Sequence, residues 1–164
     1  MGSRSKTDTA YIAGFLDGDG SVMLQVKLRA DTKRGVRFMA TICFYQDTRH
    51  EKPLLWIREI VGAGYVSRRN DGMTELRING YAQVREILSE LQPFIRFKVK
   101  QVRALIRACK MLEEKPIKAF SKQELRQLVE FVFLIRSENY ASRSTVTKEE
   151  LYRKAIEELF QKSH

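Results

Sequence analysis

The segment Ala10-Tyr-Ile-Ala-Gly-Phe-Leu-Asp-Gly-Asp-Gly-Ser21 decides the fold of this chain. It opens with small and apolar residues, as in a packed helix, and closes with two carboxylates separated by glycines. Asp8 and Thr9 are both suitable N-caps, so we expect a helix from there to about Leu16, ended by the Asp-Gly-Asp-Gly sequence. Because Mg²⁺ and Ca²⁺ bind oxygen ligands, carboxylates at a helix end indicate a metal site.

Two other interpretations of these carboxylates have to be considered. An EF-hand calcium loop also begins Asp-x-Asp, but its sixth position requires glycine, where this chain has Val22, and its twelfth requires glutamate, where it has Leu28. The simpler alternative is that Asp17 and Asp19 only terminate the helix, since Asp and Gly are common at helix ends. The residues alone therefore exclude the calcium loop and leave the other two interpretations open.

The charge of the chain indicates its partner. The 164 residues include 30 Lys+Arg against 20 Asp+Glu, a net charge of +10, with basic residues spread from Arg4 to Lys162. Such a chain attracts a polyanion such as DNA or RNA, with solubility alone as the alternative explanation. No apolar run approaches the ~20 residues of a membrane span, so we expect no membrane partner.

Composition and cysteine content predict the domain organisation and the setting. With 43% hydrophobic residues, the chain is expected to form one domain over residues 9–160. A flexible N-terminus, 1–8, in part consistent with a cloning remnant, would precede it, and a tail, 161–164, would follow. Cys43 and Cys109 provide neither a disulfide framework nor a zinc-binding pair. We therefore expect an intracellular protein, from a prokaryotic cytoplasm or an organelle.

Hydrophobic patterning predicts the order of the elements. Residues 22–28 and 37–45 alternate apolar and polar side chains, which predicts the two strands of a hairpin. The Asp71-Gly72 turn predicts a second hairpin over residues 64–79. Helices are expected over 53–62, 81–91 and 98–113, and after the capping boxes Ser121/Glu124 and Thr147/Glu150. The resulting αββαββα order, followed by C-terminal helices, predicts an α+β fold with helices on one face of an antiparallel sheet.

The other face of the predicted sheet would remain open. Its outward positions mix charged, amide, hydroxyl and aromatic side chains, in contrast to the Lys, Glu and Thr typical of a solvated sheet. Arg and Gln form paired hydrogen bonds to guanine and adenine edges, and a β-ribbon fits the major groove. We therefore expect these positions to bind DNA: Gln25, Lys27, Arg29, Arg37, Thr41, Tyr45, Ser67, Arg69, Glu75 and Arg77.

Small residues line one face of the first predicted helix. Ala10, Gly14 and Gly18 recur every four residues, and such a face allows two helix backbones to approach closely. If two copies of the chain pair through this face, two-fold symmetry places their Asp-Gly-Asp ends side by side.

The segment Tyr11-Ile-Ala-Gly-Phe-Leu-Asp-Gly-Asp-Gly20 resembles the signature of the LAGLIDADG homing endonucleases. The similarity extends to the αββαββα order, to Gly62-Ala-Gly-Tyr-Val66 and to Leu91-Gln-Pro-Phe-Ile-Arg-Phe-Lys-Val-Lys-Gln101, and covers most of residues 9 to 160. The motif is present in one copy, as in the homodimeric branch of that family. The resemblance implies the homing-endonuclease fold, a saddle-shaped antiparallel sheet followed by C-terminal helices.

The resemblance also implies a function. It implies an intron-encoded, site-specific endonuclease that makes a double-strand break in a long pseudo-palindromic DNA target by Mg²⁺-dependent hydrolysis, with Mn²⁺ as a substitute and no small-molecule cofactor. Asp19 would bind the metal with the backbone carbonyl of Gly18, while Gln46 and Lys98 would complete the catalytic set. The homodimer interface would contain Ala10, Ala13, Gly14 and Asp17.

Further DNA contacts follow from the same resemblance. Relatives often carry arginine at the position that aligns with His50, next to Arg49. An imidazole is only partly protonated near neutral pH. Which of the two residues contacts the DNA phosphate therefore stays open. Lys100 and the segment from Asn139 through Tyr140 to Arg143 would contact the DNA backbone. Some LAGLIDADG proteins are RNA maturases, and a DNA-binding regulator on the same fold is a further alternative.

Overall fold

The computed structural model describes residues 4–28, 35–139 and 146–161. The DNA contacts predicted for Arg29, Tyr140 and Arg143 lie outside these ranges. In the described part of the chain, no helix is long and apolar enough to span a membrane.

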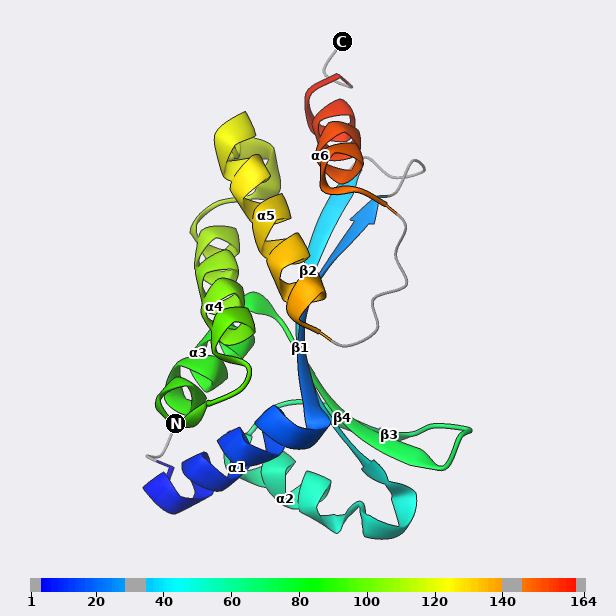
Figure 1. Ribbon diagram of the computed structural model, residues 1–164, viewed down its shortest axis with the longest axis vertical. Helices are drawn as coiled ribbons and strands as arrows, with labels where there is room; N and C mark the ends of the chain where they lie inside the picture. The colour runs from blue at the N-terminus through cyan, green and yellow to red at the C-terminus, as the bar shows by residue number, and fades with distance from the viewer. Residues whose placement is uncertain (1–3, 29–34, 140–145, 162–164) are drawn as a thin grey trace.

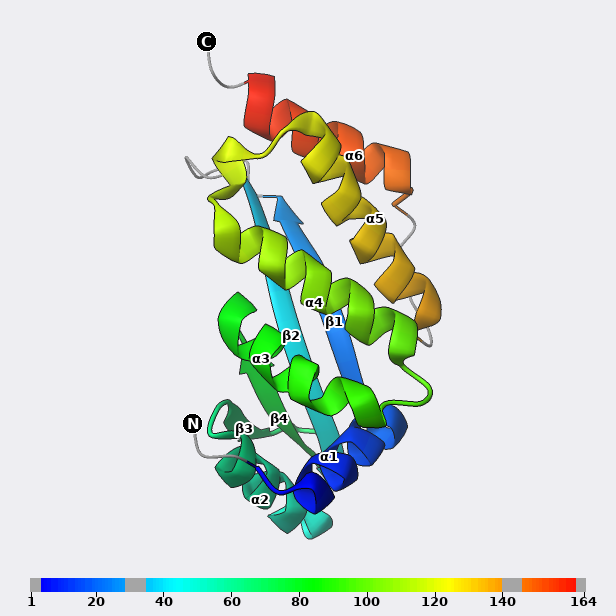
Figure 2. The ribbon, with the colours of Figure 1, turned by 90° about the vertical axis from the view of Figure 1, so that its left-hand side faces the viewer.

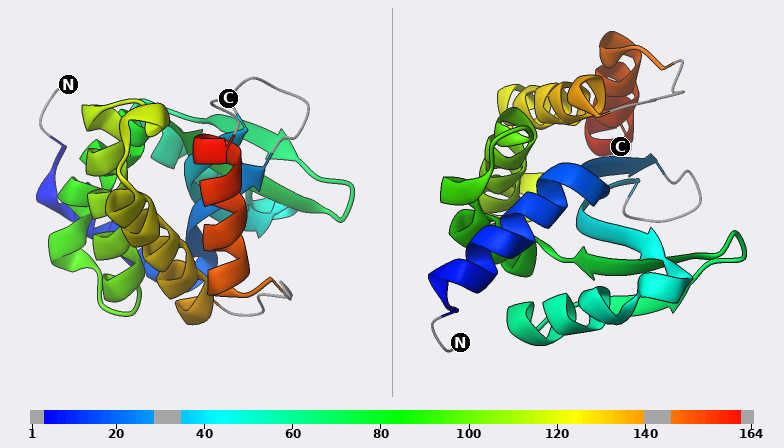
Figure 3. Two further views of the ribbon diagram at one scale, coloured as in Figure 1. Left: turned by 90° about the horizontal axis from the view of Figure 1, so that it is seen from above. Right: turned by 60° about the horizontal axis from the view of Figure 1, so that its bottom comes forward.

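A four-stranded antiparallel sheet forms the centre of the molecule. Its strands are β1 (Gly20–Leu28), β2 (Val36–Asp47), β3 (Tyr65–Arg68) and β4 (Met73–Asn79), in the spatial order β1-β2-β4-β3. The sheet is twisted and curved (Figure 3), and both hairpins follow the predicted alternation. The predicted α+β class is confirmed.

The helices are α1 (Lys6–Asp19), α2 (Lys52–Val61), α3 (Tyr81–Leu91), α4 (Val99–Glu114), α5 (Lys122–Glu138) and α6 (Lys148–Ile156), which ends in a π-helical turn, Glu157–Gln161. Helices α3, α4 and α5 lie over one face of the sheet (Figure 2), and in the described ranges the opposite face has no helix over it (Figure 1). Both predicted capping boxes are present at the starts of α5 and α6.

The core lies between the sheet and these helices. Val22, Leu24, Phe38, Ile42 and Phe44, which alternate along β1 and β2, are each at most 2% exposed. Removing this much apolar surface from water is the main stabilisation of the sheet on its helices. The same alternation directs the intervening side chains to the open face.

Helix α1 is longer than the sequence predicted, at both ends. Ser5, not Asp8 or Thr9, is its N-cap, and the Ser5 side chain accepts a hydrogen bond from the Asp8 amide at 3.1 Å. Arg4 donates to the carbonyls of Ile60 and Val61, and α1 begins at Lys6, within the segment predicted as the N-terminus. The helix also continues past Leu16 to Asp19, because the chain turns directly into β1 at Gly20.

Candidate active site and nucleic-acid interface

The turn from α1 into β1 depends on Gly20. A Cβ atom at this position would lie 2.6 Å from Leu16 Cδ1 and 2.9 Å from Leu16 Cα, so only glycine allows the strand to start directly at the helix end. Gly20 pairs with Phe44 of β2, which places the preceding residue, Asp19, beside the end of β2 where Gln46 lies. Asp19 is exposed, so its carboxylate faces solvent at the edge of the sheet.

Oxygen donors gather at this helix end. The carbonyl of Gly18 belongs to the last turn of α1, which lacks helical N–H partners, and the C-terminal end of a helix carries a partial negative charge. Together with the Asp19 carboxylate it offers the hard oxygen ligands that Mg²⁺ prefers. Across residues 4–28, 35–139 and 146–161, no three His, Cys, Asp or Glu residues cluster as a metal site. The donor set therefore fits a divalent cation only when phosphate, water or a second chain completes it.

Asp17 holds the segment that carries Lys98. Its carboxylate accepts hydrogen bonds from the backbone amides of Arg96, at 2.7 Å, and Lys98, at 3.0 Å, and its own carbonyl accepts one from Lys98 Nζ at 2.6 Å. Burial lowers the pKa of the Lys98 ammonium, and the nearby charges of Asp17 and Asp19 act in the opposite direction. The structure thus brings Lys98 to Asp19. Both oxygens of the Asp17 carboxylate are thus used within its own chain, and the place of Asp17 in a homodimer interface stays a prediction.

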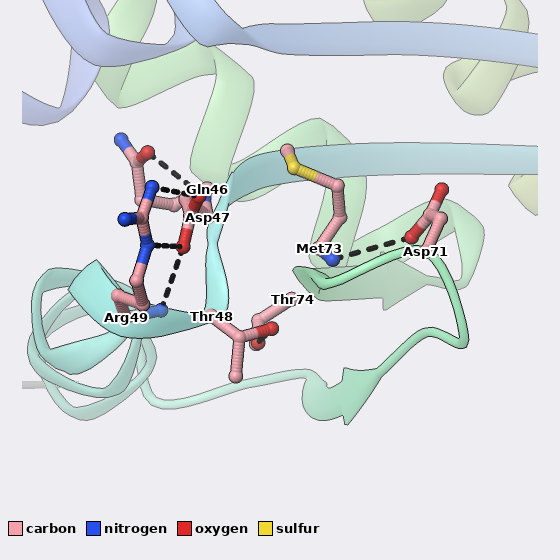
Figure 4. A network of polar contacts seen from close by, with 7 residues as sticks. All are labelled: Gln46, Asp47, Thr48, Arg49, Asp71, Met73 and Thr74. Atoms are coloured by element: carbon pink, nitrogen blue, oxygen red, sulfur yellow. Dashed lines mark hydrogen bonds and ion pairs between the residues drawn. The ribbon is translucent and has the colours of Figure 1, made fainter.

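Gln46 lies in a compact polar cluster at the end of β2 (Figure 4). Its Oε1 accepts a hydrogen bond from the Asp47 amide at 2.9 Å. The Asp47 carboxylate in turn accepts from the backbone amide, Nε and Nη2 of Arg49, at 2.8, 3.0 and 2.9 Å, and these bonds lower the pKa of Asp47 to about 2. Our sequence reasoning missed Asp47. The signal for it is an aspartate two residues before an arginine at the start of a turn, a pattern typical of an N-cap.

The open face of the sheet presents most of the predicted DNA contacts. Lys27 and Arg37 are exposed and lie opposite each other in the β1–β2 register. Half-buried side chains on this face are held by polar neighbours: Tyr45 is hydrogen-bonded to Ser21 at 3.2 Å, and Arg77 donates to Glu75 at 3.3 Å. The remaining predicted positions, Gln25 and Ser67, are also half-buried, and Arg69, Lys100 and His50 are exposed.

Two predicted DNA contacts have other roles in the structure. Thr41 faces the open side but is fully buried, and its hydroxyl donates to Asn79 Oδ1 at 2.8 Å, so it is not available to a base. The side-chain amide of Asn139 donates to the Val22 carbonyl at 3.0 Å and fastens the end of α5 to the edge strand β1. Neither contact was predictable from local sequence, because both partners are distant in the chain.

The predicted small face of α1 is largely accessible in the structure. Gly14 and Gly18 are exposed, and a Cβ atom at either position would meet no atom within 4 Å, so nothing within the described chain requires glycine there. Ala10 is half-buried next to them. The prediction for Ala13 is wrong, because its side chain is fully buried in the core of its own chain.

An open, basic sheet face with an oxygen-donor site at its edge is the arrangement expected of an enzyme that acts on a nucleic acid. A family model described as LAGLIDADG endonuclease matches residues 12–105, and the chain belongs to this family.

Individual relatives agree with this assignment. The DNA endonuclease I-CvuI of Chlorella vulgaris is 32% identical over 103 residues, which span 63% of this chain and 64% of that protein. The DNA endonuclease I-CreI of Chlamydomonas reinhardtii is 28% identical over 152 residues, 93% of this chain and 90% of that protein. The crystal structure of I-CvuI with its target superposes with a TM-score of 0.82 at 25% identity, covering 94% of this chain and 98% of that one. The archaeal I-Vdi141I, at 17% identity and a TM-score of 0.79, shares the fold over 92% of this chain and 96% of its own.

Proposed function

We propose that this chain is a site-specific homing endonuclease that acts as a homodimer on a long pseudo-palindromic DNA target. The observation that carries the proposal is the exposed Asp19 carboxylate at the edge of the basic sheet face, with Lys98 and Gln46 close by. The relatives support it: structures of I-CvuI contain its target in the presence of Ca and the I-CreI target, uncleaved, in the presence of Mg.

Asp19 and the Gly18 carbonyl would hold the divalent metal, which we propose to be Mg²⁺, with Mn²⁺ as a substitute. A metal bound there would stabilise phosphate charge and favour ionisation of a water. Lys98 presents its ammonium to the charge that develops on the scissile phosphate. The Oε1 of Gln46 accepts from the Asp47 amide, which leaves the side-chain NH₂ group to donate to the attacking water.

A homodimer explains why one chain contains half of a site. Each chain contributes one exposed carboxylate, and the glycine face of α1 allows a second copy to approach closely. Two-fold symmetry then brings two Asp19 residues together and places two sheets over two half-sites. The alternatives, an RNA maturase or a DNA-binding regulator, do not require the metal-binding carboxylate, so its presence beside Lys98 favours cleavage.

The substitution Asp19→Asn tests this function. A target is first selected from a random duplex library by cleavage with Mg²⁺. We expect Asp19→Asn to retain binding in Ca²⁺ and to lose at least about 100-fold in cleavage rate, as when one group that stabilises transition-state charge is removed. Asp8→Asn, a carboxylate at the opposite end of the same helix, is the matched control and should cleave normally. Full Mg²⁺-dependent cleavage by Asp19→Asn would refute the proposal.

A further inference from the structure

Arg49 is held in one orientation by Asp47. Both carboxylate oxygens of Asp47 are used, Oδ1 by the Arg49 backbone amide and Nε, and Oδ2 by Nη2. The arginine side chain nevertheless remains 81% exposed, whereas that of Asp47 is 36% exposed. The contact therefore orients the guanidinium at the surface without burying it.

The contact leaves the outer edge of the guanidinium available. An arginine has five N–H donors, of which Asp47 takes Nε–H and one of the Nη2 pair. The donors that remain lie on the side away from Asp47 and face solvent. A planar fork of this kind matches two oxygens of a phosphate, and its orientation by Asp47 removes part of the entropic cost of forming that contact.

Asp47 also holds Gln46. Its backbone amide donates to Gln46 Oε1, so one residue determines the orientation of both neighbouring side chains. Figure 4 shows Gln46 and Arg49 on the same side of the end of β2. The turn itself is anchored by Thr48, whose amide donates to the Gly72 carbonyl at 2.9 Å and whose hydroxyl lies 2.9 Å from that of Thr74.

His50 lacks such support. It is exposed, and in the described residues no hydrogen bond orients its imidazole. The guanidinium of an arginine is always charged in proteins, and its planar fork matches two phosphate oxygens.

We propose that Arg49, and not His50, is the cation that contacts the DNA phosphate beside Gln46, and that the Asp47 carboxylate is the positioning group for the Arg49 side chain. The inference rests on the proposed endonuclease function and assigns the basic position of that site, which the sequence left open. It also gives a reason, beside its N-cap role, for an acidic residue at a surface that binds a polyanion: the Asp47 carboxylate repels phosphate but orients the guanidinium that binds it.

The experiment compares Arg49→Gln, His50→Gln and Asp47→Asn in single-turnover cleavage of the selected target, with binding measured separately in Ca²⁺. We expect Arg49→Gln to lower the cleavage rate about 10- to 100-fold, the range for one charge-assisted hydrogen bond, and to change affinity much less. His50→Gln should have a smaller effect and leave the pH dependence of the rate unchanged. Arg58→Gln, which removes an exposed charge from α2, is the control for net charge.

A double-mutant cycle separates positioning from a structural role. Asp47→Asn should slow cleavage in the wild-type background and have little further effect in Arg49→Gln, because its action passes mainly through Arg49. Thermal unfolding checks that each variant is folded. If Asp47→Asn does not fold, Asp47→Ser, which retains a capping oxygen, replaces it in the cycle.

The outcomes distinguish this inference from the function on which it rests. If His50→Gln slows cleavage more than Arg49→Gln, or if Asp47→Asn has equal effects in both backgrounds, the assignment is wrong while the endonuclease function stands. If the wild-type chain cleaves no duplex with Mg²⁺, the function fails and the assignment fails with it.

Discussion

Glycine residues at the end of α1 have different physical roles although they share one short motif. At Gly14 and Gly18 a Cβ atom would meet nothing within 4 Å, whereas at Gly20 it would meet the backbone and side chain of Leu16 at 3.0 Å or less. Gly20 is therefore required by the fold of one chain. Gly14 and Gly18 have no such reason within the described chain, which agrees with the proposal that a second copy approaches this face.

The pair Gly14→Ala and Gly20→Ala tests this distinction. We expect Gly20→Ala to lower the free energy of unfolding by about 1–3 kcal/mol, the usual cost of overpacking. At protein concentrations where the chain is monomeric, Gly14→Ala should not lower the free energy of unfolding. It could raise this free energy by up to about 1 kcal/mol, because alanine favours a helix. It should, however, weaken the dimer. Urea unfolding and sedimentation measure the two effects, and equal destabilisation by both variants would contradict the distinction.

At the scale of elements, Glu51 connects the start of α2 to the second hairpin. Its carboxylate accepts hydrogen bonds from Arg68 Nε of β3 at 3.0 Å and from Thr74 Oγ1 of β4 at 2.8 Å. These bonds hold the pKa of Glu51 at about 2, below its ordinary value of 4.5. The turn that carries Arg49 lies immediately before Glu51, so the same contacts stabilise the edge of the candidate site.

The shifted pKa of Glu51 predicts how stability depends on pH. A carboxyl group whose folded pKa is depressed contributes stability that is fully present above its unfolded pKa of 4.5 and is lost as the pH falls toward its folded pKa of about 2. Glu51→Gln should therefore be less stable than wild type at about pH 7, and the difference should shrink toward the acid end. Urea unfolding across this range measures it, with Glu59→Gln on the exposed side of α2 as the control. A pH-independent difference would show that the carboxylate charge is not involved.

At the scale of the whole molecule, Phe97 is the most exposed large hydrophobic side chain among the described residues, at 84%. Asp17 binds the amides on either side of it, so Phe97 projects from a fixed segment beside the glycine face of α1. On the same helix Tyr11, 57% exposed, packs edge-on against Trp56, with ring centroids 5.6 Å apart. The rings of Tyr11 and Trp56 line a cavity of about 520 Å³, together with Thr7, Asp8, Lys52 and Pro53.

These apolar surfaces predict where the homodimer is sensitive to substitution. Burying a phenylalanine contributes about 1.5–3 kcal/mol, so Phe97→Ala should raise the dimer dissociation constant at least about tenfold. Leu134→Ala, which truncates an exposed side chain of α5 far from α1 in sequence, should leave it unchanged. Sedimentation equilibrium over a concentration series measures both constants. Dimerisation that is insensitive to Phe97→Ala would place the interface elsewhere.

Local patterns were sufficient for the strands, the turns and the capped helices. Alternation predicted which side of β1 and β2 packs on the helices, because a strand has a period of two wherever it lies. Thr41 shows the limit of this reasoning: its position on the open face was correct, but Asn79, on another strand, covers and binds its hydroxyl. Ala13 shows the same limit for a helix, since the small residues of α1 face both the core and solvent.

The sequence by itself determined the family, the order of the elements, the basic character of the open face and the candidate carboxylate, because each depends on residue type and short-range spacing. Only the tertiary structure decided what each polar group of the motif binds. Asp17 is used by the Arg96–Lys98 segment, Asp19 is left exposed, and α1 ends where Gly20 meets Leu16. Hydrogen bonds and steric contacts between residues far apart in the chain fix these assignments, and no local pattern contains them. In the proposed homodimer, the motif that decides the fold therefore supplies half of a site.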